Sequence, residues 1–188
     1  MTALVTLDPA EHERRAAVGI GAVTDPALLD RLLDLPSGVP VTDPWIWAET
    51  AEQHPGIIDR DNDGRTVTRR LVPPLTVDDV IVARAAGQEL RAVQDASLFA
   101  AFTRRWIAAA RGLPDAIVFE AKLTGVGVKD PQGKVLLDAE APRLPVIDGW
   151  SWLLQEKSYQ QWLSQPRQDY VTASQAPATG EATATRAT

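Results

Sequence analysis

The sequence predicts a mostly helical, single-domain α+β fold with two β-hairpins that form one small antiparallel sheet. Apolar residues recur at helical spacing in several segments, which is typical of amphipathic helices. Two turn motifs, Asn62-Asp63-Gly64 and Pro131-Gln132-Gly133, lie between stretches rich in β-branched residues, which is typical of hairpins. The chain is 45% apolar and 23% charged, so its composition is that of a globular protein with a core.

The 188 residues are expected to form one packed domain between two loosely ordered ends. Residues 1–25 are expected to be loosely structured, apart from a short helix that Asp8-Pro9 opens. The globular domain is expected to span residues 26–165. Residues 166–188 are small, polar and without pattern, and we expect a disordered tail that orders only against a partner.

In the first half of the domain, the leucine pattern "ALLDRLLDL" predicts a helix after Pro26. A second helix is expected over residues 44–53, with proline at its first position. Val67 lies between two threonines, so the segments that flank the turn at Asn62–Gly64 are expected to be strands.

In the second half, helices are predicted over residues 76–86 and, most strongly, over residues 96–111. In the latter segment the aromatic residues Phe99, Phe102 and Trp106 recur at three- and four-residue steps, which favours a helix with one core-facing stripe.

The remaining elements are a hairpin and a final helix. Strands are expected on both sides of the turn at Pro131–Gly133, the first of them covering residues 116–130. The final helix is expected over residues 150–165, with Trp152 and Glu156 on a shared face.

The acidic stretch "DRDNDGRT" is similar to the start of a calcium-binding loop. An EF-hand loop needs oxygen ligands at positions 1, 3 and 5, glycine at position 6 and a bidentate carboxylate at position 12. Asp59, Asp61, Asp63 and Gly64 match the first four, but Arg70 occupies the twelfth. The sequence therefore favours a solvated hairpin turn with local hydrogen bonds. Weak binding of Ca or Mg by the three aspartates is the alternative.

The segment "PDAIVFEAKLT" is the second candidate site. Glu120 and Lys122 lie two apart on a predicted strand, so both side chains would point to one side. With Asp115 they resemble the core of the PD-(D/E)xK nuclease superfamily, in which the acids hold Mg²⁺ and the lysine assists an attacking water. The chain departs from that pattern, because the aspartate normally comes from a preceding strand.

Composition excludes several other classes of chemistry. The chain has no cysteine, so thiol catalysis and cysteine-ligated zinc are excluded. The chain has two histidines, His12 and His54, but no Gly-x-Ser-x-Gly motif that would supply a nucleophilic serine. We therefore expect no nucleophilic triad. The net charge is −6, whereas nucleic-acid-binding domains typically carry an excess of basic residues. No signal peptide or membrane-spanning run is expected, which predicts a cytoplasmic protein or one within a virion or other intracellular assembly.

The tryptophans carry a prediction about partners. Tryptophan is favoured in interfaces because it combines a large apolar area with one polar group. The C-terminal helix is expected to be the first docking element. For any single tryptophan, however, packing in the core is the favoured interpretation, because large aromatic side chains are highly buried on average. The expected interaction residues are Trp45, Trp47, Trp150, Trp152 and Trp162.

The segment "RTVTRRLVPPLTVDDVIVARAA" has the expected order of strand, proline-rich break, Thr-x-Asp-Asp and helix. That order is similar to the opening of tail-assembly proteins of tailed bacteriophages. The resemblance implies a protein that works by contact within a phage-type particle or its assembly line.

The sequence thus favours a non-enzymatic structural or assembly protein without a cofactor, which acts through protein partners or self-assembly. A Mg-dependent nuclease that uses Glu120 and Lys122 is the alternative. A regulatory module that binds a small acidic or apolar ligand is a third interpretation.

Overall fold

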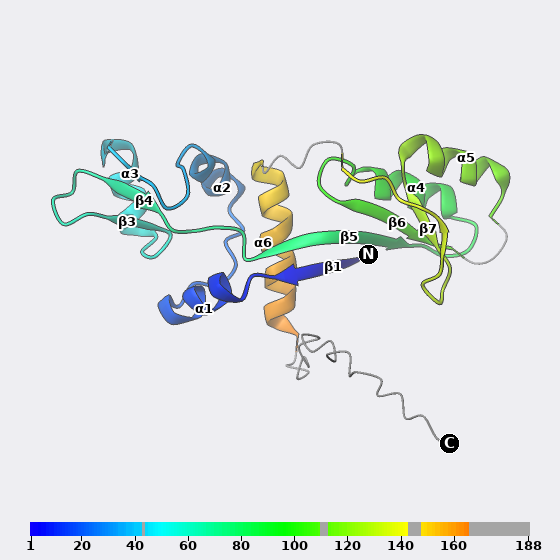
Figure 1. Ribbon diagram of the computed structural model, residues 1–188, viewed down its shortest axis with the longest axis horizontal. Coiled ribbons are helices and arrows are strands. Elements are labelled where there is room, and N and C mark those ends of the chain that lie inside the picture. The colour runs from blue at the N-terminus through cyan, green and yellow to red at the C-terminus, as the bar shows by residue number, and fades with distance from the viewer. Residues whose placement is uncertain (43, 110–112, 143–147, 166–188) are drawn as a thin grey trace, which may run out of the picture.

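A computed structural model describes residues 1–42, 44–109, 113–142 and 148–165. In these residues the fold is α+β, with two sheets and six helices (Figure 1). The strands are β1 Thr2–Leu7, β2 Pro40–Val41, β3 Ile58–Arg60, β4 Val67–Arg69, β5 Leu75–Ala83, β6 Arg104–Ala108, β7 Gly127–Lys129 and β8 Val135–Leu137. The helices are α1 Pro9–Val18, α2 Pro26–Leu33, α3 Pro44–Gln53, α4 Glu89–Ser97, α5 Asp115–Thr124 and α6 Gly149–Ser164.

The larger sheet, called the large sheet below, has five strands in the order β1-β5-β6-β7-β8. The three central strands are parallel, and α4 and α5 connect them. The two outer strands, β1 and β8, are antiparallel to their neighbours. Because parallel crossovers are right-handed, successive crossovers in one direction place both helices on the same face of the sheet.

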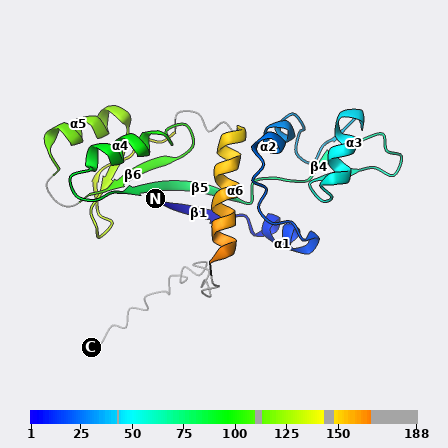
Figure 2. The same cartoon turned by 180° about the vertical axis from the view of Figure 1, so that it is seen from behind.

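The main core lies between this face of the large sheet and the helices α4, α5 and α6. Val80 of β5, Ile107 of β6 and Tyr159 of α6 are among its buried residues. Alternate residues of β1 face the same core, while the residues between them are exposed. Figure 2 shows α6 crossing in front of β1 and β5, so this helix lies in the same layer as α4 and α5.

A second core lies beside the three-stranded sheet, which has the order β2-β4-β3 and is called the small sheet below. Leu29 and Leu32 of α2 and Val67 of β4 are among its buried residues. The N-terminal half of α6 enters this core through Trp152 and Leu153. The helix α6 therefore belongs to both cores and joins the two lobes seen in Figure 1.

Local chemistry explains where several helices begin. Asp8 accepts a hydrogen bond from the backbone N–H of Glu11 at 3.1 Å, which caps α1, and a proline follows at the first helical position. Asp148 and Ser151 bond each other's backbone N–H groups at 2.7 and 2.9 Å, which is a capping box at the start of α6. The short helix opened by Asp8-Pro9 is thus confirmed.

A buried group of charges connects α1 with α6. The guanidinium of Arg15 donates to both carboxylate oxygens of Glu156, at 2.7 and 2.8 Å. Its Nε donates to Glu11 at 2.7 Å. All three residues are buried, so the lobes meet around an ion cluster that excludes water.

The N-terminal 25 residues are more regular than the sequence predicted. Thr2–Leu7 forms the edge strand of the large sheet, although it lies about 70 residues from its partner β5 in sequence. The prediction of a loosely structured segment is therefore wrong, because a strand that pairs only with a distant segment leaves little local signal.

Both predicted hairpins are confirmed, but they do not form one antiparallel sheet. The hairpin of β3 and β4 belongs to the small sheet, and that of β7 and β8 belongs to the large sheet. The large sheet is mixed, because its three central strands are parallel. The helices predicted after Pro26, over residues 44–53 and at the C-terminal end are confirmed as α2, α3 and α6.

Three predicted elements are wrong. The helix expected over residues 76–86 is the strand β5, which pairs with a strand on each side. Residues on both of its faces are buried, so its sequence lacks the apolar–polar alternation of a half-exposed strand. The helix expected over residues 96–111 is the end of α4 followed by β6. The strand expected over residues 116–130 is mostly the helix α5, because two parallel neighbours such as β6 and β7 need a crossover between them.

Candidate functional site

The acidic stretch forms the turn of the hairpin between β3 and β4, as predicted. The carboxylate of Asp61 accepts hydrogen bonds from the backbone N–H groups of Arg65 at 2.7 Å and Thr66 at 3.1 Å. Gly64 has φ +65°, which suits a residue without a side chain. The backbone N–H of Thr66, together with those of Arg65 and Gly64, holds the pKa of Asp61 below its ordinary value. The loop is thus stabilised by its own backbone donors.

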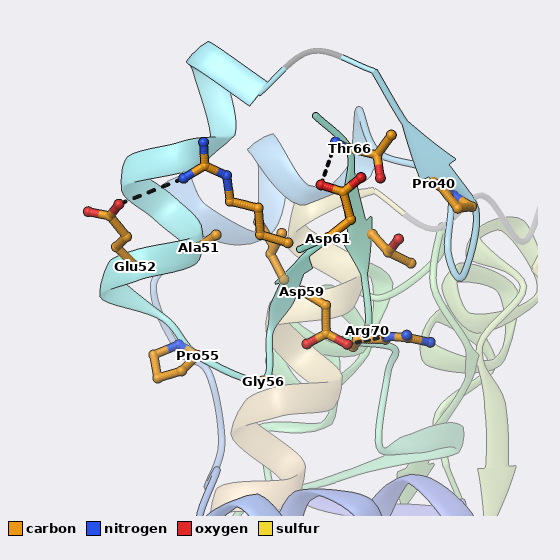
Figure 3. A pocket seen from close by; sticks show the side chains of 12 residues that line it. Pro40, Ala51, Glu52, Pro55, Gly56, Asp59, Asp61, Thr66 and Arg70 are labelled. Carbon is orange, nitrogen blue, oxygen red and sulfur yellow. Dashed lines mark hydrogen bonds and ion pairs between the residues drawn. The ribbon is translucent and has the colours of Figure 1, made fainter. Parts of the chain in front are cut away.

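A cavity of about 490 Å³ lies beside this hairpin, between the small sheet and the end of α3 (Figure 3). Four of its five charged groups form two ion pairs, and the fifth, Asp61, is bonded by backbone N–H groups. Arg70 donates to Asp59 at 2.6 Å, and Arg60 lies 3.9 Å from Glu52. The cavity therefore offers hydrogen bonds to a polar ligand but carries little uncompensated charge.

Of the three aspartates in the alternative metal site, Asp59 lies in β3, and Asp61 and Asp63 lie in the segment between β3 and β4. Asp59 is held by Arg70, and Asp61 is held by backbone donors. In the described part of the chain no group of three or more histidine, aspartate or glutamate side chains is arranged to hold a metal ion. Weak binding of Ca or Mg by Asp59, Asp61 and Asp63 stays a prediction.

Asp115, Glu120 and Lys122 all lie on α5 rather than on a strand. On a helix, residues two positions apart are rotated by roughly 200° about the axis, so Glu120 and Lys122 point to different sides. Asp115 is in the first turn of the same helix, five residues before Glu120. The geometry on which the nuclease resemblance depended is therefore not formed by these three residues.

The structure separates the predicted interaction tryptophans. Trp47 and Trp152 are 6% and 1% exposed and lie in the second core, each beneath an arginine guanidinium. Trp162 is partly buried against the main core and stacks on Tyr159. The side chain of Trp45 lies outside the described residues. Trp150 is 70% exposed, which is the opposite of what an apolar side chain of this size usually shows.

Trp150 borders an apolar cleft of about 280 Å³, called the Trp150 cleft below. The N-terminal half of α6 forms one wall, and the turn that follows α4 forms the other. Its lining residues are Phe99, Phe102, Trp150, Leu153, Leu154 and Lys157. Leu98, in the same turn after α4, is 74% exposed and extends the apolar surface.

Lys157 supplies the only charge among the lining residues of the Trp150 cleft. Its side chain is exposed and makes no ion pair within the described residues. The cleft therefore combines a large apolar area with one cation that no acidic side chain of the described chain neutralises in an ion pair.

The sequence identified Trp150 but missed the other wall of the cleft. Phe99 and Phe102 were expected on the core-facing stripe of a long helix, whereas α4 ends at Ser97 and leaves them half-buried in a turn. No local pattern marks them as surface residues, because their exposure depends on where the chain leaves the helix.

None of the helices in the described residues has the length and apolarity to cross a bilayer. Comparisons with protein-family models, with curated protein sequences and with solved structures gave no match.

Proposed function

We propose that this protein is a structural or assembly component that binds another protein through the Trp150 cleft. The observation that supports the proposal is the exposure of Trp150 beside an apolar hollow. Contiguous apolar surface with a polar rim is typical of interaction sites. Tryptophan is also among the residues that dominate binding energy at such sites.

The charge of the cleft indicates the kind of partner. The hollow accepts one or two apolar side chains, and Lys157 at its edge attracts a carboxylate. The partner segment we infer is therefore an amphipathic helix of another protein, with a leucine or aromatic residue close to an aspartate or glutamate.

A displayed peptide library tests this inference directly. Selection on the wild-type chain should enrich peptides in which an apolar residue lies three or four positions from an acidic one. The Trp150→Ala variant should bind those peptides weaker by about 2 kcal/mol or more, roughly thirtyfold, because the anchor residue is lost. Fluorescence titration with an enriched peptide measures the change.

Two further variants make the experiment decisive. Lys157→Glu should reverse the charge preference and select basic peptides in place of acidic ones. Leu163→Ala removes a side chain that is 43% exposed on the same helix but outside the cleft, and it should bind like wild type. Enrichment without any acidic preference would overturn the role inferred for Lys157. Equal binding by Trp150→Ala would show that the cleft is not the binding surface.

The nuclease alternative has no observation in its favour. Its lysine and glutamate are on a helix and point apart, as described above. Membership of a phage-type particle stays a prediction from the resemblance. The expected helix after Thr76, which formed part of that resemblance, is the strand β5.

A further inference from the structure

The strand β1 is an outer edge of the large sheet. Among the described residues it pairs only with β5, so every second backbone N–H and C=O along its outer side lacks a partner strand. Six residues make it twice as long as β8, the three-residue strand at the opposite edge.

Natural edge strands are often guarded against pairing with another chain by charged residues, by proline or by bulges. The pair of β1 and β5 has a register shift between Leu4 and Val5, but β1 lacks the other two guards. Its sequence, TALVTL, contains no charged residue and no proline. Leu4 at its centre is 44% exposed, and it points away from the helical layer. A long, uncharged edge of this kind is a site for another strand.

A groove runs along the same edge. A hollow of about 180 Å³ lies between β1 and the C-terminal half of α6. Ala3 and Val5 border it from the strand, and Gln161 and Trp162 border it from the helix. A strand that added to β1 would lie over this groove, with alternate side chains directed at Trp162.

We propose that the occupant is β1 of a second copy of this chain, so that two large sheets join into one continuous sheet. Two identical strands pair antiparallel about a two-fold axis perpendicular to the sheet, and the contact is then self-complementary. The axis keeps the helical layers of both copies on one face. The alternate residues Ala3, Val5 and Leu7 of the second copy would meet the groove, and they are apolar as the groove requires.

Symmetry limits the register. Paired residues must point to the same face, so either Leu4 or Val5 can lie opposite its own copy with five residues of each strand paired. The proposed register is the one with Leu4 opposite Leu4. A shift by two residues would bring in Asp8. The backbone N–H of Asp8 already bonds Pro74 at 2.9 Å, and its carboxylate caps α1. No charged side chain lies in the paired segment, so the two copies meet without like-charge repulsion.

Charge variants at Leu4 test the proposal by sedimentation equilibrium. Wild type should form dimers at concentrations of about 100 μM, a range suited to a modest interface. Leu4→Lys and Leu4→Glu should each weaken self-association about tenfold or more, because like charges then lie opposite each other. An equimolar mixture of the two should associate again. Leu136→Lys, at a 50% exposed position on the other edge strand, should dimerise like wild type.

A thiol variant tests the register. The chain has no cysteine, so Leu4→Cys introduces a single thiol. Residues opposite each other in an antiparallel pair have Cα atoms about 4.5–5.5 Å apart, within the range of a disulfide. Mild oxidation should therefore cross-link Leu4→Cys. The thiol of Thr2→Cys should not cross-link, because its symmetry mate lies four residues along the strand.

Three results would overturn the proposal: a monomeric wild type, a Leu4→Lys variant that associates like wild type, or an equimolar mixture of Leu4→Lys and Leu4→Glu that stays monomeric.

This contact does not use the Trp150 cleft. Peptide binding by the Leu4 variants should equal that of wild type, so failure of one proposal is distinguishable from failure of the other.

Discussion

At the scale of single residues, Arg15 is a buried cation that is held by several charged and backbone acceptors. It is fully buried and donates to Glu11, to Glu156 and to the backbone carbonyl of Val72 at 2.7 Å. Glu156 in turn accepts hydrogen bonds from the backbone N–H of Val23 and the indole of Trp152. Every strong donor and acceptor in the cluster is therefore satisfied, which is the condition under which buried charges are tolerated.

Removal of one charge from this cluster should destabilise the fold strongly. Glu156→Gln leaves Arg15 buried with one carboxylate in place of two, and we expect the free energy of unfolding to fall by about 3–5 kcal/mol. Urea unfolding at neutral pH measures the loss. The matched control is Asp59→Asn in the pair of Arg70 and Asp59, whose side chains are both about half exposed, and it should cost less than about 1 kcal/mol. Equal losses in the two variants would contradict this account.

The same cluster predicts how stability depends on pH. Burial raises the pKa of Glu11, but the hydrogen bonds and charges of Arg14 and Arg15 outweigh it, and the net pKa lies below its ordinary value. A carboxyl with a lowered folded-state pKa stabilises the fold above its unfolded pKa, about 4.3, and that stabilisation is lost as the pH falls through the folded value.

In Glu11→Gln, the free energy of unfolding should therefore fall less steeply than in wild type as the pH is lowered below about 4.5. Urea unfolding at each pH measures this free energy. The exposed neighbour Glu13 provides the control, since Glu13→Gln should keep the wild-type pH profile. An unchanged profile in Glu11→Gln would show that the ion cluster does not govern acid unfolding.

At the scale of elements, α6 connects the two cores. Its N-terminal residues pack against α2 and the small sheet, and Tyr159 and Trp162 pack against the large sheet. The helix therefore cannot keep its packing on one side while the other side unfolds. Both lobes should unfold in one cooperative transition.

Leu32→Ala tests this coupling. Leu32 is fully buried in the second core, and its truncation should cost about 2–5 kcal/mol. Hydrogen exchange of the most protected amides in β5 and β6, which belong to the other lobe, should accelerate by the same free energy. Protection of β5 and β6 that stays at the wild-type level would show that the lobes unfold independently.

At the scale of the whole molecule, the two proposed contact surfaces use successive parts of α6. The residues of α6 that line the Trp150 cleft end at Lys157, and the groove beside β1 begins at Ser158. The two surfaces share no lining residue, so both can be occupied at once. A dimer joined through β1 would present two clefts, as an assembly component requires.

The candidate site was only partly predictable. Trp150 and the hairpin turn at Asp61 follow from local chemistry, since an indole at a helix start and an Asx-rich turn are recognisable in the sequence. Phe99 and Phe102 are not, because their spacing also fits a buried helical stripe. Glu120 and Lys122 were expected on one side of a strand, and a helix separates them.

The sequence by itself determined the features whose causes are local. Helix caps such as Asp8 and Asp148 and the glycine of the turn at Gly64 act within a few residues, so their consequences are visible in the chain. Only the tertiary structure decided that residues 76–83 are a strand and not a helix. Their apolar pattern fits both periods, and the choice rests on pairing with β1 and β6, whose hydrogen bonds join segments far apart in sequence.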